Sequence, residues 1–288
     1  MLLQRVFRPC SLTSNSRTLY MRPNSCSNGL PRTVRTTKSS PLTASLRHWF
    51  SSSRSQFSSS SHSQLRYYAR RPPPRRGLFS FLDHIPENTI FYGIIGANAT
   101  VFVMWYMSTQ KYKQEGDPSA IFWMQQNFTS SWRNLVEGRI WTPLTACFSH
   151  QNLPHILMNG FTFFFMAPPV LQILGNKSFL GLYLGGGLFS SFASIAYAKI
   201  TGKKDYHSHG ASGAIYSVVS LLACAAPTLT FRIYGIIPVP AWLAVSGFFA
   251  YDLWSTMQEK TGNTDTVGHI GGILAGVGYF VMKRFKIF

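Results

Sequence analysis

The sequence predicts an all-α membrane protein with six transmembrane helices, preceded by a basic N-terminal segment that lacks a folded core. Two observations predict this. Six stretches without Asp, Glu, Lys or Arg follow one another after the first 88 residues, each close to membrane-spanning length. The formal net charge is +18, but 14 of the 27 lysines and arginines lie before position 80, and the first acidic residue is Asp83. The positive charge therefore belongs to one segment and does not indicate a nucleic-acid-binding surface.

Residues 1–68 form the basic segment, which is rich in Arg and Ser and has no apolar run long enough for a core. This composition is typical of an organellar transit peptide, and a secretory signal is disfavoured because Gln4 and Arg5 interrupt the first apolar residues. The stretch from Arg66 to Ala69 resembles a presequence-cleavage pattern in which an arginine lies three residues before the mature start. We therefore expect the mature chain to begin at Ala69. The alternative is a disordered basic tail that stays attached.

A basic, proline-rich linker is expected over residues 69–88, and a membrane domain over residues 89–288. Spanning the hydrocarbon takes about 20 predominantly apolar residues. Six windows of the domain approach that length: Thr89–Met107, Leu153–Gly175, Ser178–Ala198, Gly210–Phe231, Ile233–Tyr251 and Thr266–Met282. The domain's two cysteines, Cys147 and Cys224, are expected to be small buried side chains, and they show no metal-ligand spacing.

A long loop separates the first two windows. Asp117 and Pro118 look like an N-cap and first helical residue, and an aromatic-rich stretch follows. It contains Phe122, Trp123, Phe128 and Trp132. We expect either a helix in the membrane interface or an ordinary packed loop helix.

Polar residues inside membrane spans are costly and therefore indicate where function lies. His155 and Asn159 open the second window, Ser212 opens the fourth between Gly210 and Gly213, and His269 opens the sixth. With six antiparallel crossings, the starts of all even-numbered helices lie on the same side of the membrane. These four polar groups are therefore expected to meet at one depth.

A hydroxyl, a base and hydrogen-bond donors at one depth can perform acyl transfer. His155 and Asn159 are four residues apart and share a helical face, so with the Ser212 backbone N–H they would form an oxyanion hole. Gly272 and Gly276 give the sixth helix a face that allows close approach to a neighbour. If that neighbour is the fourth helix, Ser212 and His269 come within hydrogen-bond reach.

Tyr216 lies one turn after Ser212, and we expect its ring to stack on His269. Asp265 is not expected to complete a catalytic triad, because it precedes His269 by four residues, in a loop. Each group also has a simpler explanation, such as helix packing or capping. A transporter or proton channel is a further alternative, although no internal repeat is visible.

The chain resembles the rhomboid family in two sets of residues: Gly210, Ala211, Ser212 and Gly213 with His269, Gly272 and Gly276, and the second-helix set His150, His155 and Asn159. The resemblance implies a six-helix rhomboid core that cleaves transmembrane helices of other membrane proteins, with no metal and no cofactor. It implies Ser212 as nucleophile, His269 as base and His155 and Asn159 as oxyanion donors. It also implies Tyr216 as stacking partner and His150 as a structural donor.

The expected substrates are single-pass or signal-anchored membrane proteins, reached within the lipid bilayer. An inactive rhomboid relative that binds or escorts membrane proteins is the alternative function. The expected location is the mitochondrial inner membrane, with the plastid inner envelope membrane as alternative. Basic residues before the first span and after the last place both ends on the matrix or stromal side, so the site would face the intermembrane space.

Overall fold

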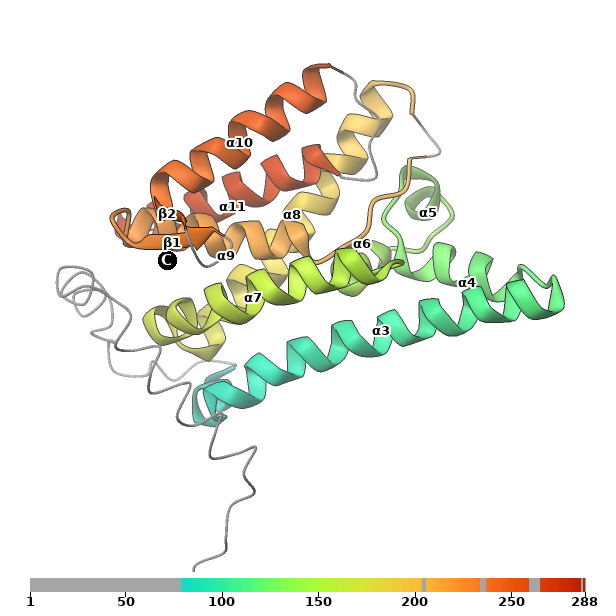
Figure 1. Cartoon of the computed structure of the whole chain (residues 1–288), viewed down its shortest axis with the longest axis horizontal. Coiled ribbons are helices and arrows are strands. Elements are labelled where there is room, and N and C mark those ends of the chain that lie inside the picture. Colours follow the sequence, from blue (N-terminus) through green and yellow to red (C-terminus); the bar gives the residue numbers. More distant parts are fainter. Residues whose placement is uncertain (1–78, 204–205, 234–236, 259–264, 286, 288) are drawn as a thin grey trace, which may run out of the picture. The chain divides into compact units, whose positions relative to one another are not determined.

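The computed structural model in Figure 1 describes residues 79–203, 206–233, 237–258, 265–285 and 287. The predicted transit peptide 1–68, its expected cleavage point at Ala69 and residues 69–78 of the predicted linker lie outside the described residues. The rest of the predicted linker is partly helical, because it contains the 3-10 helix η1 (Ser80–His84) and the start of α3.

Helices dominate the described part of the chain, which confirms the predicted all-α membrane fold class. The long helices are α3 (Glu87–Glu115), α7 (Leu153–Leu174), α8 (Asn176–Ile200), α9 (Ser212–Ala225), α10 (Ala241–Met257) and α11 (Thr266–Arg284). Between α3 and α7 lie α4 (Ser119–Phe128), α5 (Trp132–Val136), α6 (Thr142–Thr145) and η2 (Ala146–Phe148). Among the described residues, α3, α7 and α8 are long and apolar enough to cross a membrane, and α9 is a shorter apolar helix.

Two of the predicted windows, Gly210–Phe231 and Ile233–Tyr251, include residues that are not helical. Helix α9 ends at Ala225, and the antiparallel strands β1 (Thr230–Ile233) and β2 (Ile237–Pro240) separate it from α10. Prolines explain the difference, because a proline has no backbone N–H to donate and disfavours a helical conformation in the residue before it. Pro227 lies just after α9, and Pro240 precedes α10 directly. An uncharged stretch does not reveal such a break.

Helix α9 lies at the centre of the helix bundle. It contacts α7, α8, α10 and α11, and 11 of its 14 residues are buried. Helix α3 contacts α7 and α4, away from α9, and Figure 1 shows it along the outer side of α7. The first residue of the central helix is Ser212.

Small residues bring α8, α9 and α11 close together. A Cβ added to Gly272 on α11 would collide with the carbonyl oxygen of Gly213 on α9, so the two backbones touch. Serines add hydrogen bonds across the same contacts, including Ser220 Oγ to the Ile273 carbonyl at 3.1 Å and Ser190 Oγ to the Gly268 carbonyl at 2.7 Å. Close approach through small residues, with hydroxyls bonded across helices, is typical of packing in membranes.

The loop helix α4 packs on α3 through its buried residue Met124, which lies in one apolar cluster with Val101 and Trp105. Its Phe122 and Trp123 side chains are exposed on the other side. The predicted start is shifted by one residue, since α4 begins at Ser119 and the Asp117 carboxylate accepts from the Ser119 N–H at 2.9 Å. The helix thus combines a packed face with exposed aromatic rings.

Candidate active site

Ser212 and His269 meet where the first turns of α9 and α11 come together. The Oγ of Ser212 lies 3.0 Å from Nε2 of His269, which is hydrogen-bond distance. His269 is 7% exposed, and Ser212 is half-buried. The contact follows from the packing described above, because Gly272 lies one turn after His269 and lets α11 rest on the first turn of α9 at Gly213.

Tyr216 stacks on the imidazole of His269. The two ring centroids lie 4.5 Å apart, and the ring planes are inclined by 17°. The Tyr216 ring also meets Phe248 of α10 edge to face, with centroids 6.0 Å apart. The aromatic ring therefore lies between α10 and the histidine and restricts rotation of the imidazole.

Asp252 contacts the other nitrogen of the same imidazole, a partner that the sequence analysis did not include. Its Oδ2 lies 3.2 Å from Nδ1 of His269, and Asp252 is 3% exposed. A signal was present, because Asp252 is the single charged residue in the sequence of α10. An ionisable residue within an apolar helix indicates a functional site, but the predicted fifth window ended one residue earlier, at Tyr251.

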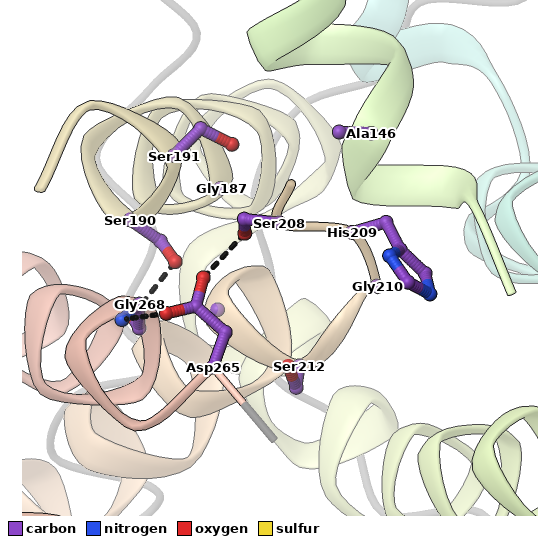
Figure 2. A pocket seen from close by; sticks show the side chains of 11 residues that line it. Ala146, Gly187, Ser190, Ser191, Ser208, His209, Gly210, Ser212, Asp265 and Gly268 are labelled. Atoms are coloured by element: carbon purple, nitrogen blue, oxygen red, sulfur yellow. Dashed lines mark hydrogen bonds between the residues drawn. The ribbon is translucent and has the colours of Figure 1, made fainter. Parts of the chain in front are cut away.

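Asp265 is the N-cap residue of α11, and its side chain has a different set of partners from that of Asp252. One carboxylate oxygen accepts from the Gly268 N–H at 2.8 Å and thereby caps α11. The other oxygen accepts from the hydroxyls of Ser194 at 2.5 Å and of Ser208. Figure 2 shows Asp265 between Ser208 and Gly268. Asp265 thus joins α8, α11 and the segment before α9. A triad acid would bond the imidazole, whereas these side-chain partners of Asp265 are two serines and a backbone N–H.

His155 of α7 lies beside the segment that leads into Ser212. Gly210 has a φ of +128°, and a Cβ there would lie 2.9 Å from Cε1 of His155 and 3.7 Å from Oγ of Ser212. Glycine at this position thus allows the imidazole and the hydroxyl to lie close to each other. The first turn of α9 has no side-chain cap, so its backbone N–H groups are available to a ligand.

Asn159 and His150 form a pair. The Asn159 Nδ2 lies 2.8 Å from Nε2 of His150, and the Ala211 N–H points at the same nitrogen from 3.5 Å. With two donors directed at it, Nε2 is placed to accept a hydrogen bond, and the role of His150 as a structural donor stays a prediction. Burial lowers the pKa of His150 to about 3, and the ring is neutral near neutral pH. Its contact orients the Asn159 amide, whose second N–H remains available.

A polar pocket of about 280 Å³, its open mouth included, adjoins Ser212. Figure 2 shows its lining, to which Ser190, Ser191, Ser208 and His209 contribute. Burial lowers the pKa of His209 to about 4, so this ring is also neutral. The expected site residues and a water-sized polar space therefore occur together at one end of α9.

Comparison with known proteins adds the family. Residues 137–284 match the family described as the Rhomboid domain. The chain is 29% identical to RHOMBOID-like protein 12, mitochondrial, of Arabidopsis thaliana over 69% of this chain and 59% of the relative. It is 26% identical to Rhomboid protein 1, mitochondrial, of Saccharomyces cerevisiae over 75% of this chain and 59% of the relative.

A third relative is the Presenilin-associated rhomboid-like protein, mitochondrial, of Rattus norvegicus, which is 31% identical over 65% of this chain and 46% of the relative. The chain thus spans about half to three-fifths of the length of these relatives. The family match covers α7 to α11, which carry Ser212 and His269. This chain belongs to the rhomboid family.

Proposed function

We propose that this chain is an intramembrane serine endopeptidase in which Ser212 is the nucleophile and His269 is the general base. One observation carries the proposal: the Ser212 hydroxyl and the His269 imidazole lie 3.0 Å apart at the start of two packed membrane helices. A serine hydroxyl is a weak nucleophile near neutral pH, and an adjacent imidazole activates it. Membership of the rhomboid family supports the same reaction.

In the first step the Ser212 Oγ attacks a peptide carbonyl carbon, and its proton passes to Nε2 of His269. The carbonyl π electrons move onto oxygen, and the C–N bond then breaks as His269 returns the proton to the departing amine nitrogen. Water repeats the sequence on the acyl-enzyme and releases a carboxylic acid and free Ser212. The polar pocket beside Ser212 offers space for that water.

The developing oxyanion needs donors that are already in position. We assign this role to the backbone N–H of Ser212 with the side chains of His155 and Asn159. The free first turn of α9 supports the assignment. So does the contact from His150 that orients the Asn159 amide.

The proposed substrates are single-pass or signal-anchored membrane proteins, because the site lies on helices that meet within a membrane domain. A helical substrate hides its carbonyls in backbone hydrogen bonds, so the segment to be cleaved must unwind first. Substrate helices weakened by Gly, Pro or Ser near the scissile bond should therefore be preferred.

The proposed location is the mitochondrial inner membrane, with the site end facing the intermembrane space. The names of these three relatives include "mitochondrial", and residues 1–68 have the composition of a transit peptide. N-terminal sequencing of the organellar protein should begin within a few residues of Ala69. Recovery of Met1 from purified mitochondria, or import into plastids alone, would contradict this placement.

Cleavage of a model transmembrane substrate tests the proposed function. The mature chain is reconstituted in liposomes with a single-pass substrate that carries a Gly-Pro kink. We expect one membrane-internal cut that the Ser212→Ala variant does not make. Ser217→Ala is the matched control, because Ser217 lies on the same helix, is buried and bonds Leu182 O at 3.2 Å. Binding of the substrate without cleavage would favour the escort function.

A further inference from the structure

We propose that Asp252 is a positioning residue that holds His269 in its reactive orientation and tautomer, an inference that rests on the proposed protease function. Three side chains from three helices are connected in series: Asp252 on α10, His269 on α11 and Ser212 on α9. The two contacts use opposite nitrogens of the imidazole, at 3.2 Å and 3.0 Å. The site is therefore an acid–base–nucleophile series and not a pair alone.

The first argument concerns which nitrogen carries the proton. A neutral imidazole has one N–H, and Nε2 can receive the Ser212 proton only if that N–H is on Nδ1. A carboxylate oxygen only accepts hydrogen bonds, so Asp252 Oδ2 favours the N–H on Nδ1. The opposite tautomer would direct a lone pair at the carboxylate and a proton at the serine.

The second argument concerns charge. Asp252 is 3% exposed and is the single charged residue in the sequence of α10. General-base catalysis starts from a neutral imidazole, which offers the carboxylate a hydrogen bond but no opposite charge. When His269 takes the serine proton, the imidazolium and the carboxylate form an ion pair. This interaction is stronger in the transition state than in the ground state, and only such interactions raise kcat.

Other groups around the imidazole do not duplicate this role. Tyr216 restrains the ring through its face and not through Nδ1. Asp265 is occupied by Gly268, Ser194 and Ser208. His155 is a histidine and has no negative charge to offer an imidazolium. Among the described residues, Asp252 is thus the acid that contacts Nδ1.

A purely structural role would be to join α10 to α11, and a second contact makes the two roles separable. The hydroxyls of Thr256 on α10 and Thr266 on α11 lie 2.7 Å apart, and this contact does not involve His269. Thr256→Val removes that polar contact and also the bond from the same hydroxyl to the Asp252 backbone carbonyl at 2.8 Å, while the Asp252 carboxylate itself is unchanged. It is therefore the matched control for Asp252→Asn.

The experiment measures kcat and KM of the reconstituted mature chain on the single-pass substrate, with active sites counted by exhaustive fluorophosphonate labelling. For Asp252→Asn we expect kcat to fall by about 10- to 100-fold with KM unchanged, because the loss arises in the transition state. Thr256→Val should keep kcat within about 2-fold. Asp252→Glu and Asp252→Gln, which differ in charge and little in size, should differ in kcat by about tenfold.

Two failures are distinguishable. Cleavage that does not need Ser212 would overturn the proposed function and this inference with it. Cleavage that needs Ser212, with the kcat of Asp252→Asn equal to wild type, would overturn the inference alone. If Asp252→Asn fails to fold, equal kcat values for the Glu and Gln variants would overturn it.

Discussion

The contact between α9 and α11 and the outer faces of α3 and α10 follow opposite packing rules. At the contact, small residues let the two backbones touch, and the Ser220 hydroxyl of α9 bonds the Ile273 carbonyl of α11. The outer faces carry large exposed apolar side chains, among them Val103, Tyr106 and Met107 on α3 and Trp242 and Tyr251 on α10. The first region is built on close fit, and the second on compatibility with lipid.

A membrane enzyme can hold a site precisely where its helices fit closely together. Lipid tails are as apolar as leucine, so burial of apolar surface does not drive helices together within a bilayer. Close packing and interhelical hydrogen bonds hold the helices together instead, and both occur where Ser212 and His269 meet. The proposed chemistry should therefore be sensitive to single atoms at the contact and insensitive to larger changes on the outer faces.

The largest effect is expected from Gly272→Val. The added Cβ would collide with the Gly213 carbonyl oxygen and lie 3.0 Å from its carbonyl carbon, and backbone atoms cannot move aside cheaply. We expect a loss of about 3 kcal/mol or more in the free energy of unfolding, with no cleavage. Gly278→Val is the control on the same helix, because nothing lies within 4 Å of its Cβ. Equal thermal midpoints and activities for the two variants would show that the close fit between α9 and α11 is not required.

Asn159→Ala should slow turnover by about 100- to 1000-fold while the fold is kept, since removing one oxyanion donor has this effect in other enzymes. Kinetics in proteoliposomes, with the thermal midpoint measured in parallel, check it. Thr162→Ala on the same helix is the control, because its exposed hydroxyl bonds only Met158 O within α7. Turnover of Asn159→Ala at the wild-type rate would remove Asn159 from the oxyanion site.

Ser220→Ala should lower the free energy of unfolding by about 0.6 kcal/mol, the mean for hydrogen bonds between membrane helices. The Ser220 hydroxyl donates to Ile273 O at 3.1 Å, across α9 and α11. Thr100→Ala is the control, because that exposed hydroxyl bonds Gly96 O within its own helix, α3. Steric-trap or denaturant unfolding in bicelles can resolve the pair. If Thr100→Ala lowers the free energy of unfolding more than Ser220→Ala does, hydroxyls at the α9–α11 contact do not contribute more to stability than exposed ones.

The smallest effect is expected from Val103→Leu on the outer face of α3, where the side chain is 50% exposed. A larger apolar side chain directed at lipid should change the free energy of unfolding by less than about 0.5 kcal/mol. Cleavage should also be unchanged. A clear loss of stability or of cleavage would show that this face of α3 packs against a protein partner and not against lipid.

Much of the fold could be predicted because its signals are local in the sequence. Uncharged stretches mark the membrane helices, and the positions of Gly272 and Gly276 on one face indicate a close helix contact. The end of α9 could not be predicted in this way, because the residues from Ala226 to Pro240 are as uncharged as a membrane helix apart from Arg232. What ends the helix there is proline chemistry and strand pairing.

The site, like the fold, has a part that local sequence signals predict and a part that they do not. Ser212, His269 and Tyr216 were proposed together because helix starts and one-turn spacings place them, and the structure brings them into contact. Asp252 was missed because it reaches His269 from a different helix, 17 residues earlier, across a contact that no spacing encodes. The acceptor role of His150 depends on where Asn159 and Ala211 direct their hydrogens, which only packing determines.

Mapping the residue that a fluorophosphonate probe modifies tests directly whether Ser212 is the nucleophile and His269 its base. A serine activated by the imidazole 3.0 Å away should react, whereas a serine that only packs or caps a helix should not. In the folded mature chain we expect one labelled peptide, modified at Ser212, with labelling lost in Ser212→Ala and slowed by at least about 100-fold in His269→Ala. Labelling of folded protein at another residue, or at Ser212 with undiminished rate in His269→Ala, would contradict the account.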